Sequence, residues 1–526
     1  MEKRITKEMN DDLQREYSKD EVVVAMQQIG PLKSPGPDGF GASLYQNYWE
    51  VVGDEVTEAT LSFLRGKGSS NCLNHTHVVL IPKIKEPKDV GDFRPISLCN
   101  VFYKIIAKTL ANRFKKVLNT VISLNQSSFI PGRLITDNII AAYEILHSMK
   151  KKKKKRGNKR SMALKLDISK AYDRVEWGFL RAVMVKLGFG EKWVGLIMQC
   201  VQTVSYAILV NGKPGNSFTP SRGLRQIYEE ASSHCLNRQK TALFSSSNIK
   251  ADIRERIRVD VGAGIQNNCE KYLGLPVMVG KSQYNTFRGI KDRVWNKISN
   301  WKNHFLSPSS KEVLLKAVAQ AVPTHHMNVF KLPVKLCKEI SALIAKFWWG
   351  SQQNENRIQW KSWAKMGTAK TEGGMGFREL QNFNTALLAK QCWRIMTMPQ
   401  FVAARVLKDK YFKHSDLLKA KLGWEPSKIW RSLWGSIGLL KEGLVWRVGN
   451  CEQVKIWEDK WIPKPIQFSI QSPQRNWSIQ YTYRENNRVA HTLAKLGLDV
   501  LDEFVWMEGV HQELIPLFCK TNYVKF

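Results

Sequence analysis

One stretch of the chain, residues 164–177, combines carboxylates, a tyrosine and basic side chains in an order suited to phosphate chemistry. Asp167 follows an apolar segment, and Tyr172 and Asp173 come within the next six residues. A carboxylate at the end of a strand, facing a cleft, can hold a divalent metal ion that binds a nucleotide phosphate. A turn aspartate that caps the next helix is the alternative, and the bare pattern favours it.

Two elements have to position Asp167. The apolar segment Met162–Ile168 predicts a short buried strand that delivers the carboxylate at its end. The segment after it predicts a helix, because its apolar residues recur at near-helical spacing: Val175, Phe179, Val183 and Leu187. The sequence therefore predicts a strand, a turn and a helix around Asp167.

Five further motifs surround this unit in a fixed order. They are Lys33–Phe40, Leu80–Lys83, Phe93–Leu98, Phe129–Arg133 and Arg222–Gln226. Together with residues 164–177 they resemble the reverse transcriptases of non-long-terminal-repeat (LINE-type) retrotransposons, closest to the plant elements. Six motifs in the same order make the resemblance specific. It implies an α+β right-hand polymerase that carries out RNA-directed DNA polymerisation.

The resemblance assigns roles to individual residues. Asp167 matches the catalytic metal ligand, which implies Mg²⁺ as the cofactor. Tyr172 matches the aromatic residue that rejects a ribose 2′-hydroxyl, and Gln226 matches the glutamine that supports the template–nucleotide pair. Arg94 is a candidate clamp for the triphosphate of an incoming deoxynucleotide. A loop arginine in water is an equally good interpretation of Arg94.

After Gln226 the chain departs from the family pattern. The family continues with a palm helix and a hairpin that carries two adjacent aspartates, whereas here Gln226 leads directly into Ile227. The single Asp-Asp pair of the sequence is Asp11–Asp12. Two Mg²⁺ ions held about 3.5–4 Å apart need more carboxylates than Asp167. The sequence therefore predicts an internally deleted, catalytically defective enzyme; a real deletion and a mis-spliced gene model both explain the join.

Charge and cysteine usage restrict the partners and the compartment. The net charge of +35, from 81 Lys and Arg against 46 Asp and Glu, predicts RNA and DNA as partners, with an anionic membrane surface as the second candidate. No apolar run approaches the ~18 residues of a membrane span. Nine cysteines without a CxxC pair are typical of free thiols in a reducing compartment, so the nucleus or the cytoplasm is expected.

Two basic segments are candidate contacts to nucleic acid. One is the run Lys150, Lys151, Lys152, Lys153, Lys154, Lys155 and Arg156. Like charges in a row do not pack, so a loop is expected, either bound to nucleic acid or read as a nuclear localisation signal. The other is a helix over residues 100–118, whose basic side includes Lys104, Lys108 and Arg113. That side either follows a phosphate backbone or is simply solvated.

The fold class expected is α+β: a fingers and palm remnant followed by a largely helical, Trp-rich C-terminal half. Residues 18–247 are predicted to form the fingers and palm, interrupted after 226, and residues 248–345 a thumb-like helical region. Residues 346–462 are a Trp-rich region, and 478–497 resemble the last helix of a ribonuclease H-like domain. Because 13 of the 18 tryptophans lie between 295 and 461, we interpret them mainly as core residues. Residues 227–462 are expected to hold a core of their own, and residues 1–226 to pack loosely.

The function predicted is that of a retrotransposon-derived, catalytically defective reverse transcriptase homologue. A non-catalytic nucleic-acid-binding protein and a relic without function are the alternatives. An active enzyme would show Mg²⁺-dependent primer extension.

Overall fold

The computed structural model describes 12 segments of the chain: residues 2–67, 73–151, 161–166, 168–170, 175–224, 232–236, 242–245, 249–261, 271–280, 282–301, 306–350 and 358–444. The chain divides into two compact units, residues 1–437 and 438–526. Of the second unit, the structure describes only residues 438–444, at the end of helix α18 (Ile437–Gly443).

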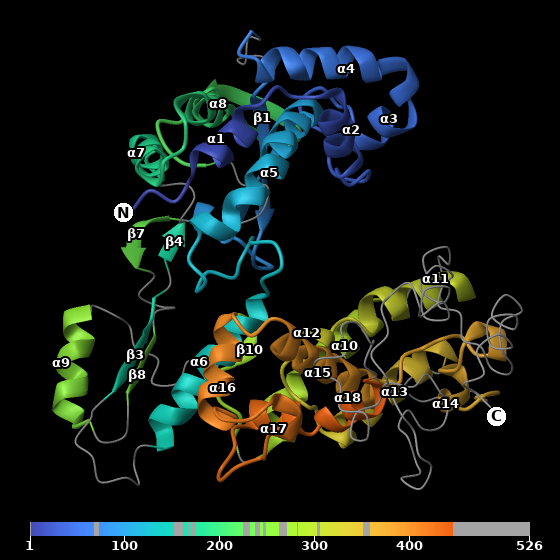
Figure 1. Ribbon diagram of the computed structural model, residues 1–526. Helices are drawn as coiled ribbons and strands as arrows, with labels where there is room; N and C mark the ends of the chain where they lie inside the picture. The colour runs from blue at the N-terminus through green and yellow to red at the C-terminus, as the bar shows by residue number, and fades with distance from the viewer. Residues whose placement is uncertain are drawn as a thin grey trace, which may run out of the picture. The chain divides into compact units, whose positions relative to one another are not determined.

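The N-terminal helices pack around one long helix. Their bounds are α1 Lys7–Gln14, α2 Lys19–Gln27, α3 Ala42–Asn47, α4 Trp49–Leu64 and α5 Val101–Val121 (Figure 1). Helix α2 begins with a capping box, because Ser18 accepts from the Glu21 amide while the Glu21 carboxylate accepts from the Ser18 amide.

A core lies between these helices and two later ones, α7 (Trp177–Leu187) and α8 (Glu191–Gln202). Trp193 is 1% exposed, and its ring lies 6.3 Å from that of Phe114, which also contacts Phe189. Fully buried aliphatic residues surround these rings: Leu13, Val22, Val101, Ile105 and Ile106. Loose packing of residues 1–226 was therefore a wrong prediction for this part, since α1, α2, α5 and α8 share a buried core.

Helix α7 forms as predicted, and its buried face includes the predicted Val183 and Leu187 but not Phe179. Phe179, expected on the apolar side, is 65% exposed, whereas Met184 and Leu187 are buried. Leu180 and Val183 are packed against the same core. The contacting face therefore runs through Leu180, Val183, Met184 and Leu187, a spacing of three and four residues.

A four-stranded sheet has the order β2-β1-β5-β6. The strands are β1 His75–Pro82, β2 Phe93–Cys99, β5 Ser205–Val210 and β6 Lys213–Phe218, and only the β1–β5 pair is parallel. A short 3-10 turn, η1 (Val90–Asp92), leads into β2. Strands β5 and β6 form a hairpin whose turn is Asn211-Gly212, with φ of 52° and 80°. Positive φ at both central residues is what a two-residue hairpin turn requires, so β6 begins already at Lys213.

The segment around Asp167 forms two short strands. They are β3 (Met162–Lys165) and β4 (Ile168–Lys170), which pair antiparallel with β8 (Ala242–Ser245) and β7 (Ser232–Leu236). The predicted buried strand is wrong in one respect, because Leu164 and Leu166 are 42% and 53% exposed. Among the described residues each pair has two strands only, so no further strand covers β3. The hairpin that follows Gln226 in the family pattern is missing from the sequence. Strands β7 and β8, which come after Gln226, pair with β4 and β3 in its place.

The rest of the described chain is largely helical, as predicted. Its longer helices are α6 Ile135–Lys151, α9 Ala251–Val261, α10 Gln283–Trp301, α11 Pro308–Leu314, α13 Val334–Trp348, α15 Leu380–Thr397, α16 Val402–Tyr411 and α17 Lys428–Trp434. Two short helices, α12 (Thr324–Met327) and α14 (Trp363–Met366), a π-helical turn at Leu315–Ala319 and a small hairpin, β9 (Lys271–Tyr272) with β10 (Leu275–Pro276), complete this part. Helix α6 packs against α16 and α17.

Aliphatic residues, not tryptophans, form most of the C-terminal core. Trp430 is fully buried and stacks on Tyr411 at 4.6 Å. By contrast Trp360, Trp393, Trp424 and Trp434 are 39% to 92% exposed. The interpretation of the tryptophans as core residues is therefore wrong for these four. Fully buried positions here are Leu336, Ile340, Ile344, Leu380, Leu388, Leu407, Ile429 and Leu433.

Candidate nucleic-acid interface

Three of the predicted site residues, Asp167, Tyr172 and Gln226, lie outside the described residues. The structure places their neighbours: Leu166 ends the stretch after β3, and Ile168 begins β4 opposite Leu236. The residues between Met162 and Leu166 also line an apolar cavity of about 290 Å³, together with Tyr143 and Leu146 of α6. The roles assigned to Asp167, Tyr172 and Gln226 stay predictions.

Arg94 lies on β2, with its backbone opposite Ile81 of β1. Its side chain is exposed. The structure therefore tests neither interpretation of Arg94, as a triphosphate clamp or as a solvated side chain.

The lysine run begins inside a helix, which corrects the expected loop. Helix α6 continues through Lys151, and Lys150 is exposed on its last turn. The apolar face of α6 explains this extension, because Leu146 and Met149 pack against Val277 up to the helix end. The remaining candidates, Lys152 to Arg156, lie outside the described residues.

Arg113 does not belong to the solvated side of α5, contrary to the sequence interpretation. Its side chain is 1% exposed and forms an ion pair with Glu21 at 2.7 Å. The guanidinium also donates to the backbone carbonyls of Leu13, Arg15 and Glu16 and lies 3.6 Å from the centroid of the Tyr17 ring. Arg113 is therefore a structural residue that joins α5 to the α1–α2 connection.

The other basic side chains of α5 form a cationic ridge with Lys33. Lys104, Lys108 and Lys115 are spaced by four and seven residues, which a helix places on one face. Burial lowers the pKa of the Lys108 ammonium, and the Lys115 and Lys33 ammonium groups lower it further. Burial also lowers the pKa of Lys104, again with a contribution from Lys33. We call these four residues the lysine ridge.

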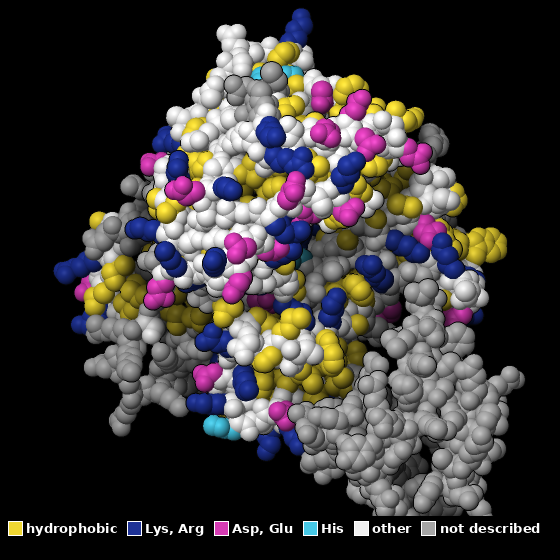
Figure 2. All heavy atoms as spheres, turned by 45° about the horizontal axis from the view of Figure 1, so that its top comes forward, with side chains coloured by type: hydrophobic (Ala, Val, Ile, Leu, Met, Phe, Trp, Pro, Cys, Tyr) yellow, Lys and Arg dark blue, Asp and Glu magenta, His cyan; other side chains and the backbone are white. Residues whose placement is uncertain are grey.

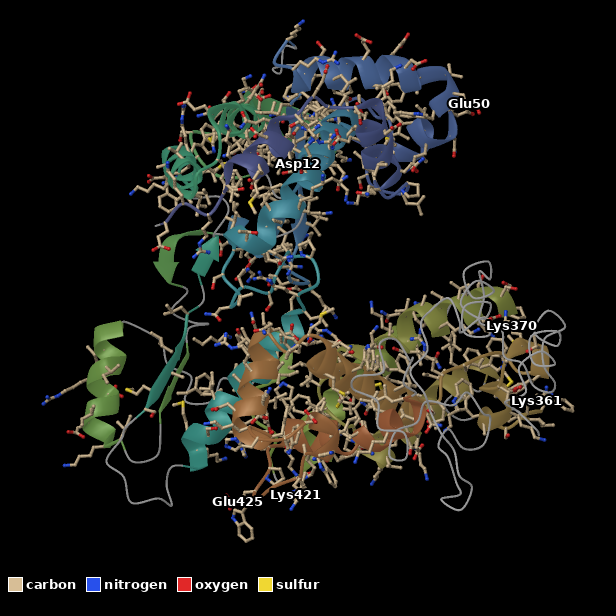
Figure 3. All side chains as sticks on the ribbon, in the orientation of Figure 1. Asp12, Glu50, Lys361, Lys370, Lys421 and Glu425 are labelled. Carbon is tan, nitrogen blue, oxygen red and sulfur yellow. The ribbon has the colours of Figure 1, made fainter. Side chains whose placement is uncertain are left out.

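Three lysines of the ridge differ from neighbouring lysines because they have no carboxylate ion-pair partner, whereas the Asp38 carboxylate acts on Lys104. Among the described residues, no carboxylate forms an ion pair with Lys33, Lys108 or Lys115. Lys116, the next residue along α5, pairs with Asp12 of α1 at 3.2 Å (Asp12 is labelled in Figure 3). Ammonium groups that repel one another without a carboxylate between them favour a bound anion.

The Pro- and Gly-rich motif of residues 33–40 lies against the start of α5 and so positions Lys33. Asn100 accepts from the Asp38 amide at 3.4 Å, and Lys104 donates to the Ser34 carbonyl at 2.9 Å. A Cβ atom on Gly36 would lie within 2.6 Å of the Asn100 backbone, so this close approach requires glycine. The motif therefore supports one end of the lysine ridge.

The part of the lysine ridge that lies on α5 can be recognised from the sequence. The helical spacing of Lys104, Lys108 and Lys115 is visible in the sequence and would have separated them from Arg113. The contribution of Lys33 was not visible, because it comes from a loop about 70 residues earlier. Figure 2 shows Lys and Arg spread over the visible face with Asp and Glu among them, so local arrangement matters more than net charge there.

Comparison with known proteins identifies the domain that contains α5. Residues 81–226 match the family described as Reverse transcriptase (RNA-dependent DNA polymerase). An uncharacterized mitochondrial protein of Arabidopsis thaliana is 40% identical over 143 residues, which cover 27% of this chain and 93% of that protein. The chain is a reverse transcriptase homologue and belongs to the same family as this mitochondrial protein.

Two transposon proteins are also similar to this reverse transcriptase homologue. An uncharacterized protein of the transposon TX1 of Xenopus laevis is 29% identical over 224 residues, 42% of this chain and 17% of that protein. A retrovirus-related Pol polyprotein from a type-2 retrotransposable element of Drosophila melanogaster is 25% identical over 201 residues, 38% of this chain. The chain spans only 17% and 18% of these two relatives.

Reverse transcriptases generally use Mg²⁺, which requires a matching set of ligands. Within the described part of the chain, no three Asp, Glu, His or Cys side chains lie close enough together to hold a metal ion. The described residues alone therefore do not fit a two-metal site. No helix that the structure describes is both long and apolar enough to cross a membrane.

Proposed function

We propose that this reverse transcriptase homologue derives from a plant LINE-type retrotransposon and binds RNA and DNA without catalysing polymerisation. The lysine ridge is the observation that carries the proposal. Three of its lysines lie on α5, inside the domain matched to reverse transcriptases, and Lys33, Lys108 and Lys115 have no carboxylate ion-pair partner among the described residues. Phosphate groups of a nucleic-acid backbone are the anions that such a row of lysines binds.

The loss of catalysis is proposed from the carboxylates. Asp167 is the metal ligand that the resemblance assigns in the matched domain, and the single Asp-Asp pair of the sequence lies elsewhere, in α1. There Asp12 pairs with Arg15 and with Lys116, so it serves the N-terminal helices. Transfer of a nucleotide by two metal ions needs carboxylates on both sides of the reacting phosphate. An internal deletion after Gln226 explains the absence of the other carboxylates.

The free cysteines and the lysine run support a protein of the nucleus or the cytoplasm.

The binding part is tested by the dependence of RNA affinity on salt. Neutralising Lys108 and Lys115 together, as Lys108→Gln with Lys115→Gln, removes two phosphate contacts. The slope of log affinity against log salt should become shallower by about 0.7–0.9 for each contact. Fluorescence anisotropy with a labelled RNA of mixed sequence, from low to moderate salt, measures the slope.

A matched control removes the same charge from lysines that already have partners. Lys19 pairs with Asp54 at 3.3 Å and Lys116 pairs with Asp12, so Lys19→Gln with Lys116→Gln should change the slope much less. Equal slopes for the two double variants would show that net charge, and not the ridge, binds the RNA. Absence of salt-dependent binding by the unaltered protein would contradict the proposed function itself.

The catalytic part is tested by primer extension. With Mg²⁺, an RNA template and a DNA primer, the unaltered protein should extend no more primer than its Asp167→Ala variant. Extension that disappears in Asp167→Ala would mean that other carboxylates complete the site, and the protein would then be an active polymerase.

A further inference from the structure

The loop between α5 and α6 is held by one arginine. The Arg133 guanidinium donates to the carbonyls of Ser123 at 2.5 Å and Gln126 at 2.8 Å. Its second terminal nitrogen donates to the Asn119 side chain at 3.2 Å and to the Ile122 carbonyl at 3.3 Å. These bonds satisfy carbonyl groups at the C-terminal end of α5 and fix the loop to that helix.

Both sides of Phe129 in this loop are anchored. Ser127 is 4% exposed and donates to the Asn138 side chain of α6 at 2.8 Å. Ile130 is 8% exposed, and its carbonyl accepts from the Arg133 amide. The backbone at Phe129 is therefore determined by its neighbours.

Phe129 itself is exposed and strained. Its side chain is 85% exposed, and its φ is 63°, in the left-handed region that bulky residues rarely occupy. A glycine or an asparagine would adopt this backbone at lower cost and would leave no apolar ring in water. The phenyl ring contributes little to the core, so folding does not account for it. Strain of this kind is characteristic of residues that bind a partner.

We propose that Phe129 stacks on an unpaired base of a single-stranded nucleic acid. Every nucleobase offers a π-face, so an aromatic ring held away from the protein binds single strands with little sequence preference. Phe129 lies inside the domain matched to reverse transcriptases, in the loop that follows the helix carrying Lys104, Lys108 and Lys115. The ridge supplies phosphate contacts, and the ring supplies a contact that paired bases cannot make. This inference rests on the proposed function.

Four variants test the stacking. Phe129→Ala and Phe129→Gly remove the ring, Phe129→Trp enlarges it, and Phe179→Ala is the control, because Phe179 is also exposed but lies on the regular helix α7. Binding is measured by anisotropy to a labelled single-stranded RNA and to a blunt RNA duplex of the same length. Thermal unfolding is measured for each variant.

The ring-free variants should bind the single strand roughly 5- to 150-fold more weakly, while binding of the duplex stays unchanged. Phe129→Trp should bind the single strand as well as the unaltered protein or better. Phe129→Gly should unfold at an equal or higher temperature than the unaltered protein, because glycine relieves the strain at positive φ. Loss of RNA binding together with retained stability separates a ligand contact from a structural role.

Unchanged single-strand binding by Phe129→Ala and Phe129→Gly would overturn the stacking and leave the proposed function intact. Equal losses of affinity for the single strand and the duplex would assign Phe129 a structural role and overturn the stacking proposal. A lower unfolding temperature of Phe129→Gly would do the same. If the unaltered protein binds neither RNA, the proposed function fails, and the stacking fails with it.

Discussion

At the scale of single residues, charge was a misleading guide to position. Arg113 lies four residues before the buried Val117 and seven after the buried Ile106, so helical spacing placed it on the apolar face of α5. Its charge suggested the solvated side instead. What decides its burial is Glu21, which is 92 positions away in the sequence. A side chain can be buried with its charge when a carboxylate and several carbonyls surround it, and such distant partners are not visible in a sequence.

Removal of Arg113 should destabilise the N-terminal helices. Arg113→Met leaves three backbone carbonyls without this donor and leaves Glu21 with only Arg15 and the Ser18 amide as partners, so the expected cost is about 3 kcal/mol, the lower end for a broken buried pair. Hydrogen–deuterium exchange of peptides from α2 and α5 should therefore become faster. Arg65→Met is the control, because Arg65 and Glu16 form an exposed pair, and exposed pairs contribute about 0–1 kcal/mol. Equal effects of the two substitutions would refute the structural role of Arg113.

His326 of α12 is a second residue whose surroundings only the structure shows. It is 5% exposed, and Nε2 lies 3.4 Å from the Arg293 guanidinium. Burial lowers the pKa of His326 to about 3, with further contributions from Arg293, His325 and Lys271. The imidazole is therefore neutral in the folded protein over a range of pH in which the unfolded chain already binds a proton.

The stability of the C-terminal helices should consequently depend on pH. The folded pKa of His326 lies below the unfolded value, so its contribution is complete above pH of about 6.5 and is lost as the pH falls towards 3. Between pH 6.5 and 4.5 the loss should be about 2 kcal/mol. Urea unfolding at both pH values measures it. His326→Leu should reduce the pH dependence, whereas substitution of the exposed His414 by Leu should not, and identical pH profiles for the unaltered protein and His326→Leu would contradict the assignment.

At the scale of elements, helix α6 is joined to the C-terminal helices by two ion pairs. Asp137, 2% exposed, pairs with Arg394 of α15 at 3.1 Å. Two turns later Glu144, 0% exposed, accepts from Lys410 of α16 at 2.7 Å and from the Tyr411 hydroxyl at 2.9 Å, and Ser427 also donates to it. The carboxylates are seven residues apart and so share one face of α6. Each is neutralised by a different helix.

Breaking the second pair should loosen α6 from this group. Glu144→Gln leaves the Lys410 ammonium without its counter-charge, and the expected cost is about 3 kcal/mol. Asp409→Asn, which removes an exposed pair with Lys413, should cost less than about 0.5 kcal/mol. Limited proteolysis of α6 and urea unfolding measure both. If the pair interacts as described, adding Lys410→Gln to Glu144→Gln should recover part of the loss, and strictly additive costs would argue against it.

Several elements could be predicted from local signals, and others could not. The capping box of α2 and the hairpin of β5 and β6 depend on neighbouring residues, so local patterns in the sequence contain their signals. The pairing of β3 with β8 joins residues about 80 positions apart and depends on the segment beyond the join at Gln226. The exposure of Trp360 and Trp424 also depends on packing, because a tryptophan ring is compatible with both core and surface.

At the scale of the whole molecule, both described halves contain buried cores. The described part of residues 282–444 buries an aliphatic core, but α6 of the first half packs against it, so this core does not belong to residues 227–462 alone; α1, α2, α5 and α8 share a second core. Exposed large apolar residues of the first half are spread over it, from Val51 of α4 and Ile81 of β1 to Leu164 of β3, where each strand pair has only two strands among the described residues. The order in which protease cleaves the halves stays a prediction.

The residues that form each α6 ion pair are far apart in the sequence, and this affects how the chain folds while it is being synthesised. Asp137 and Arg394 are 257 positions apart, and Glu144 and Lys410 are 266 apart. A ribosome adds about 5–20 residues each second, so roughly 10–50 s pass between translation of α6 and of its partners. The core of α1, α2, α5 and α8 is complete on the ribosome well before then. During this interval the carboxylates of Asp137 and Glu144 have no counter-ions, because Arg394 and Lys410 have not yet been translated. Docking of α6 onto its partner helices is therefore one of the last steps of co-translational folding.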